Sequence, residues 1–176
     1  ILDEGIALRQ GGITAPVLVL GGVLERQVVQ YLAHDLILAV TSLPNLLTVE
    51  EIARNLGQMA RVHLKVDTGM GRFGLLPEDV VPFARAVSQI PGLRIEGLFT
   101  HYASADEADL SYTYRQLSIY QQVLELVKEA GIAIRVRHGA NSAATMAAPE
   151  TRMDLVRPGI ALYGLRPSPD TKSSLT

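Results

Sequence analysis

In the segment 62–67, ionisable side chains alternate with aliphatic ones. His63, Lys65 and Asp67 fall on one face of an extended chain, and the valines and leucine between them fall on the other. Ionisable groups that point into a protein interior are costly unless they are paired or used in function. The segment therefore predicts either a strand with a functional polar face or an edge strand with one face in water.

Directly after this strand comes Gly69-Met70-Gly71-Arg72-Phe73-Gly74, which has the spacing of a dinucleotide-binding loop. In such a site the helix begins at the glycines, because its first N–H groups hold the pyrophosphate. Here Pro77 follows shortly after the last glycine, and a proline disfavours helical geometry at the residue before it. We therefore expect the helix to begin at Pro77 and the glycines to form an ordinary loop.

Two later loops have residues that suit a phosphate group. In the segment 138–144, Asn141 or Ser142 can cap a short helix whose free N–H groups attract an anion. In Arg157–Ile160, the proline favours an extended arginine and the glycine lets a ligand approach the backbone. A capped helix and a β-bulge without any ligand fit the same residues. His101, at the end of an apolar run, is similarly either a hydrogen-bonded core residue or part of a site.

The elements that position these residues are apolar runs alternating with segments of helical length, which predicts a parallel sheet. Both a doubly wound sheet and a (β/α)8 barrel fit, and a full barrel needs about 250 residues, so we expect about six of eight strand–helix units with the first two strands missing. The predicted strands are Val17–Leu20, Leu36–Val40, Val62–Val66, Ile95–Thr100, Ile134–Val136 and part of Leu155–Tyr163. The predicted helices are Ile1–Gln10, Val23–Ala33, Thr48–Ala60, Pro77–Ile90, Leu110–Ala130 and a short one near Asn141.

Composition narrows the classes of function. A chain of 176 residues with 48% hydrophobic residues can form one substantial core. The net charge of −2 argues against nucleic acid or an anionic membrane surface as a partner. The absence of cysteine excludes disulfides and thiolate zinc sites, and we expect no metal. No apolar run approaches the roughly 18 residues of a membrane span, and we expect a cytoplasmic protein.

Several sequence blocks resemble successive motifs of bacterial alanine racemases. They are HLKVDTGMGRFG (63–74), EGLFTHYASAD (96–106), ANSAA (140–144), DLVRPGIALYG (154–164) and, more weakly, APVLVLGG (15–22). The resemblance covers nearly the whole chain and favours the partial barrel. It implies a homodimer with pyridoxal 5′-phosphate (PLP) as cofactor, an amino acid as substrate, and interconversion of L- and D-alanine by two-base proton transfer.

The resemblance also implies roles for individual residues. Arg157 resembles the arginine that faces the pyridine nitrogen of PLP, and His101 the histidine beside it. Arg72 resembles an arginine near the phenolic oxygen and the substrate carboxylate. Lys65 resembles a lysine that is often N-carboxylated, which would remove its repulsion with Arg72. The residues that resemble groups at the PLP phosphate are Ser142, Gly159 and Ile160, and Asn141 is adjacent to them and is also expected to contribute to cofactor binding.

The resemblance places two essential groups outside this sequence. The Schiff-base lysine would lie upstream of Ile1, and the catalytic tyrosine in a β-rich C-terminal domain of the partner subunit. We therefore expect residues 1–165 to be an incomplete barrel domain, residues 166–176 to begin a linker, and the chain alone to be inactive. A racemase for serine or another amino acid, a PLP-binding barrel without catalysis, and a purely structural fragment remain as alternatives.

Overall fold

The computed structural model describes residues 1–171, apart from the side chains of Pro44 and Asn45. Within that range the chain forms one five-stranded sheet, and every pair of neighbouring strands is parallel. The strands are β1 (Val17–Val19), β2 (Leu36–Val40), β3 (Ala60–Lys65), β4 (Leu93–Phe99) and β5 (Val136–His138). The helices are α1 (Leu2–Gln10), α2 (Val28–Ala33), α3 (Leu43–Asn55), α4 (Val80–Ser88), α5 (Ser111–Glu129) and α6 (Ser142–Ala147).

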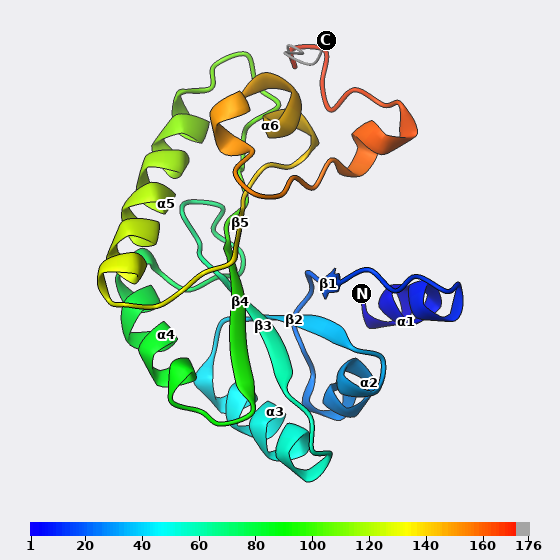
Figure 1. The fold of residues 1–176 in the computed structure, drawn as a ribbon. Helices are drawn as coiled ribbons and strands as arrows, with labels where there is room; N and C mark the ends of the chain where they lie inside the picture. The colour runs from blue at the N-terminus through cyan, green and yellow to red at the C-terminus, as the bar shows by residue number, and fades with distance from the viewer. Residues whose placement is uncertain (172–176) are drawn as a thin grey trace.

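The order of the strands decides between the two predicted architectures. They lie side by side in the order in which they occur in the sequence, whereas a doubly wound sheet reverses direction part-way. Figure 1 shows α2, α3, α4 and α5 following the curved sheet along its outer side. The described residues are therefore a part of a (β/α)8 barrel, as predicted.

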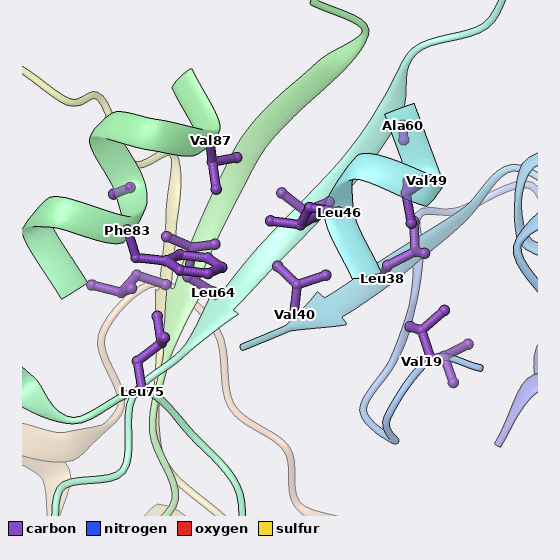
Figure 2. Packing of buried hydrophobic residues seen from close by; sticks show 14 of the residues in the cluster. Val19, Leu38, Val40, Leu46, Val49, Ala60, Leu64, Leu75, Phe83 and Val87 are labelled. Carbon is purple, nitrogen blue, oxygen red and sulfur yellow. The ribbon is translucent and has the colours of Figure 1, made fainter. Parts of the chain in front are cut away.

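The core lies between the outer face of the sheet and these helices. Leu64 on β3 and Leu38 on β2 are completely buried there, and they pack with Leu46 of α3 and Phe83 of α4 (Figure 2). This confirms the alternation predicted for β3, because its aliphatic residues face the helices. His63 and its polar neighbours consequently face the opposite, inner side of the sheet.

The prediction of a sixth strand within part of Leu155–Tyr163 is wrong. Leu155 forms a single bridge with His138, and the chain then enters a 3₁₀ helix, Gly159–Tyr163. Pro158 has no N–H to donate to a neighbouring strand, and Gly159 has a positive φ of 37°, so the backbone turns out of the sheet. The described residues thus contain five strands rather than six.

Helix boundaries also differ from those predicted. The helix expected at Thr48–Ala60 is α3, which begins earlier because a proline is tolerated in its first turn. It ends before Gly57, whose φ of 63° suits the end of a helix. The start at Pro77 is confirmed, since a 3₁₀ helix Pro77–Asp79 leads into α4. Of the predicted linker, residues 172–176 lie outside the described residues.

Candidate functional site

A cavity of about 1250 Å³ runs along the inner face of the sheet. Its walls come from all five strands, including His63 on β3, from the loops that follow β4 and β5, and from the segment after Leu155. The site residues predicted from the sequence that line it are His101, Asn141, Ser142, Arg157, Gly159 and Ile160. Two others, Lys65 and Arg72, are not part of the lining.

The Arg157 guanidinium is held by neutral acceptors at the ends of two strands, β4 and β5. Its Nη2 donates to the carbonyl oxygens of Thr100 at 2.9 Å and Gly139 at 3.1 Å. Its Nη1 lies 2.5 Å from Nδ1 of His138, and its Nη2 lies 3.5 Å from Nδ1 of His101. Among the described residues, no carboxylate forms an ion pair with Arg157. Burial lowers its pKa to about 10, so the group remains positively charged at neutral pH.

Two histidines extend this contact into the sheet. His138 is completely buried at the end of β5, and its Nε2 lies 3.0 Å from Nδ1 of His63 on β3. Burial lowers the pKa of His138 to about 2 and that of His63 to about 4. Sequence analysis did not single out either as a site residue. The signal for His63 was its place on the polar face of β3.

Asp67 organises the loop that carries Arg72. Its Oδ1 accepts the backbone N–H groups of Gly69 and Gly71 at 2.9 and 3.0 Å, and its Oδ2 accepts the N–H of Arg72 at 3.1 Å. Burial alone would raise the pKa of Asp67, but these backbone N–H groups, with that of Met70, outweigh it and lower the pKa. The Arg72 side chain itself is exposed.

Lys65 is a buried amine without a polar partner. Its Nζ lies 4.9 Å from the ring centroid of Phe73 and 5.9 Å from that of Phe99. Lys65 as a whole residue is 8% exposed. In the part of the chain that the structure describes, it has neither a counter-ion nor a hydrogen-bond acceptor. Burial lowers the pKa of Lys65, and Arg72 and Arg157 lower it further, against the opposing effect of Asp67.

The structure brings four of the predicted site residues, Lys65, Arg72, His101 and Arg157, close to one another. Burial lowers the pKa of His101 to about 4, with further contributions from Arg157, Arg72 and Lys65. The three cations are thus close enough to the histidine to act on it. Phe99 is near two of them, because the Arg157 Cζ lies 5.5 Å and the Lys65 Nζ 5.9 Å from its ring centroid. Arg157 and His101 line the cavity, whereas Lys65 and Arg72 are outside its lining.

The loop after β5 is fixed by side-chain hydrogen bonds. Asn141 caps α6, because its Oδ1 accepts the N–H of Ala144 at 2.9 Å, and its Nδ2 donates to the carbonyl oxygen of Tyr102 at 3.1 Å. The Ser142 hydroxyl donates to the carbonyl oxygen of Pro158 and accepts the N–H of Ala161 at 3.3 Å. The two loops singled out from the sequence therefore contact each other at the cavity wall.

Comparison with known proteins identifies the family. The family model "Alanine racemase, N-terminal domain" matches residues 1–167. The chain belongs to the alanine racemase family. It is 44% identical over 170 residues to an alanine racemase of Halothermothrix orenii and 46% identical over 168 residues to one of Desulforamulus reducens. These matches cover 97% and 95% of the chain but 45% of each relative.

Solved structures of alanine racemases agree with the fold. One from Clostridium difficile 630, described as a complex with cycloserine, superposes with a TM-score of 0.94 at 40% identity. One from E. faecalis has a TM-score of 0.87 at 35% identity. The chain covers 47% of each of these proteins, so it spans about half the length of its alanine racemase relatives.

The chemistry of the donor groups fits PLP. Lys65, Arg72 and Arg157 are basic groups that act on His101 in the cavity lining, and the carboxylate of Asp67 is already engaged by backbone N–H groups. An anionic ligand would balance them, and both the PLP phosphate and an amino-acid carboxylate are anionic. Arg157 also keeps a donor for a ligand, because its Nε–H has no acceptor among residues 1–171. In the same range, no cluster of three or more metal-binding side chains occurs, and no helix has the length and apolar character to cross a bilayer.

Proposed function

We propose that the protein containing this chain is a PLP-dependent racemase that interconverts L- and D-alanine. The observation that carries the proposal is the environment of Arg157. A buried guanidinium with carbonyl and histidine acceptors, no carboxylate partner among the described residues and a free Nε–H faces a cavity large enough for cofactor and substrate. Membership of the alanine racemase family supports the same conclusion.

The residues around the cavity have separate roles in holding PLP. Arg157 would donate to the pyridine nitrogen, with His101 beside it, and because arginine stays protonated it would keep that nitrogen unprotonated. When bound, PLP acidifies the α-proton of the amino acid by withdrawing electrons from the α-carbon. An unprotonated ring nitrogen moderates this effect, which favours proton return over side reactions. The residues proposed to hold the phosphate are Asn141, Ser142, Gly159 and Ile160.

Arg72 and Lys65 would act on the substrate side. Arg72 would attract the substrate carboxylate and the phenolic oxygen of PLP, held in place by the loop that Asp67 organises. The lowered pKa of Lys65 increases the fraction of its amine that is neutral, and the neutral amine would attack the carbon of CO2. The N–C bond forms as one C=O π pair of CO2 moves to oxygen, the nitrogen loses one proton to solvent, and the product is a carbamate anion. We propose this modification because the anion would replace the repulsion between Lys65 and Arg72 with an attraction.

The proposal extends to the whole protein, of which this chain is about half by comparison with its relatives. We propose a cytoplasmic homodimer in which residues 1–165 belong to the barrel and residues 166–171 begin a linker to a C-terminal β domain. Proton transfer would use a lysine and a tyrosine that are not among these 176 residues. The isolated chain would therefore not racemise alanine.

The test uses the full-length protein with added PLP. We expect the absorbance band of lysine-bound PLP and production of D-alanine from L-alanine, measured with a D-amino-acid oxidase, and we expect serine to react more slowly. A PLP band without D-product would indicate a PLP-binding barrel without catalysis. Faster turnover of serine would indicate a serine racemase, and turnover by the 176-residue chain would contradict its proposed inactivity.

A further inference from the structure

Arg157, His138 and His63 form a continuous row of hydrogen-bonding groups. Nη1 of Arg157 lies 2.5 Å from Nδ1 of His138, and Nε2 of His138 lies 3.0 Å from Nδ1 of His63. Both imidazoles are almost inaccessible, with exposed fractions of 0% for His138 and 4% for His63. Both contacts are therefore largely shielded from bulk water, and His63 and Arg157 are also part of the cavity lining.

The donors and acceptors in this row can be arranged in one way only. A guanidinium has N–H donors and no acceptor, so Nδ1 of His138 must be the unprotonated, accepting nitrogen. A neutral His138 then carries its proton on Nε2 and donates it to Nδ1 of His63. His63 must in turn be unprotonated at Nδ1 and carry its own proton on Nε2.

We propose that His63 is a positioning residue that fixes the tautomer of His138 and thereby the orientation of the Arg157 guanidinium. His63 does this by presenting a bare Nδ1 to the Nε2–H of His138. This inference rests on the proposed function only for the role of Arg157 towards the cofactor. The tautomers themselves follow from the contacts in the protein.

The sheet is built to hold the His63 ring at this place. A Cβ atom on Gly97 would lie 2.3 Å from Nδ1 of His63, so the ring occupies the space that a side chain on β4 would fill. The pairing of β3 with β4 also shifts at this point, because Val62 pairs with Ile95 and His63 with Gly97. The extra residue in β4 brings the glycine, rather than Glu96, opposite the histidine.

The His138 ring is held by an aromatic neighbour on β4. Phe99 stacks on it with ring centroids 4.8 Å apart and an interplanar angle of 3°. The charged groups near His63 are Glu96, Arg61 and Arg157, but burial is the main cause of its lowered pKa of about 4. Burial likewise lowers the pKa of His138 to about 2, and the charge of Arg157 acts in the same direction. Both rings are therefore neutral at neutral pH, as the row requires.

Removal of the His63 acceptor would have a specific consequence. The Nε2–H of His138 would be buried without a partner, which is unfavourable. His138 could relieve this by moving its proton to Nδ1, but two N–H donors would then face each other between His138 and Arg157. The guanidinium would have to turn, and its position at the cavity wall would change.

The first test is the protonation pattern of the histidines in the full-length protein, measured by NMR with ¹⁵N-labelled imidazoles. Signals of His63 and His138 are assigned by substitution, and the partly exposed His34 serves as the control through His34→Leu. We expect Nε2–H tautomers for both buried histidines, with little change from pH 6 to 8. A proton on Nδ1 of either residue, or a charged His138, would overturn the proposal.

The second test compares His63→Asn with His63→Leu. An asparagine Oδ1 can take the place of Nδ1 as acceptor, whereas leucine has a similar size and no acceptor. We expect His63→Leu to lower kcat about tenfold, the equivalent of one hydrogen bond, and to change the His138 tautomer signals. His63→Asn should restore both, and His34→Leu should change neither.

The outcomes separate this inference from the proposed function. If the tautomers are as stated but the wild-type protein produces no D-alanine, the inference about His63 stands and the proposed function fails. If His63→Leu racemises alanine as fast as the wild type, His63 does not position Arg157 and the inference fails. Equal losses in the asparagine and leucine variants would contradict it as well. If His63→Leu does not fold, the tautomers measured in the wild type and the kcat of His63→Asn still test the inference.

Discussion

Asp67 accepts the backbone N–H of Arg72, and through the same carboxylate it holds the loop between β3 and α4. We predict that Asp67→Asn leaves the fold intact but raises KM for the amino acid about tenfold, with a smaller change in kcat. The amide replaces one accepting oxygen by an NH2 group that faces backbone donors, which loses a charge-assisted hydrogen bond. Steady-state kinetics of the full-length protein measure this change.

The control for Asp67 is Glu78→Gln, which removes an exposed carboxylate at the start of the next helix. Its kinetic constants should equal those of the wild type. An unchanged KM in Asp67→Asn would mean that the loop position of Arg72 does not depend on the carboxylate.

The buried histidines predict a dependence of stability on pH. His63 and His138 have folded-state pKa values of about 4 and about 2, against 6.5 for an ordinary histidine, mainly because burial disfavours the charged form. Below pH 6.5 the unfolded chain binds protons that the folded protein does not, so the free energy of unfolding falls as the pH falls. The two residues together contribute up to about 3 kcal/mol per pH unit.

This slope is measured by urea denaturation of the full-length protein between pH 6.5 and 5, above the range in which ordinary carboxylates titrate. His101 also has a lowered pKa of about 4, so His63→Asn removes one of three such histidines, and its slope should be about two thirds as steep in this window. Equal slopes for the variant and the wild type would mean that His63 is not held neutral.

The sequence predicted those features of the fold that depend on local pattern. The alternation at 62–67 predicted which face of β3 packs against the helices, and Pro77 predicted where the helix after the glycine loop begins. The strand expected at Leu155–Tyr163 failed because its hydrophobic residues suggested a strand, while Pro158 and Gly159 turn the backbone. Apolar composition alone does not distinguish a strand from a segment that turns into a 3₁₀ helix.

The sequence predicted less of the site. Resemblance identified six residues that line the cavity, but it could not show that Lys65 and Arg72 lie outside the lining. The contact between His63 and His138 joins residues on β3 and β5 that are far apart in the chain, and it depends on a register shift at Gly97. Such a pairing becomes visible only when the strands are placed side by side.

Gly97 provides a test of how tightly the His63 ring is packed. We predict that Gly97→Ala lowers the free energy of unfolding by about 1–3 kcal/mol, because the added methyl group overlaps a ring that cannot move aside freely. Gly22→Ala is the matched control, since nothing lies within 4 Å of its Cβ position. Its stability should stay within about 0.5 kcal/mol of the wild type.

Chemical denaturation of both variants measures these differences. A second substitution, His63→Ala, in the Gly97→Ala protein should recover part of the loss, because it removes the overlapping ring. If Gly97→Ala is as stable as the wild type, the histidine is not confined by the glycine.

Asn141 separates the stability of the loop after β5 from its proposed contact with the PLP phosphate. Asn141→Asp keeps the oxygen that caps α6 but brings a negative charge to the cavity wall. We predict that it weakens PLP binding at least about tenfold, because a unit charge a few ångströms from a phosphate costs more than 1.4 kcal/mol at an effective dielectric constant of about 20. Asn141→Ala removes the cap without adding charge, and it should lower the free energy of unfolding by about 1 kcal/mol. Titration of the two full-length apo-proteins with PLP measures the effect on cofactor binding, and their thermal denaturation measures the effect on stability. If the aspartate variant binds PLP as tightly as the alanine variant, the phosphate does not lie at this loop.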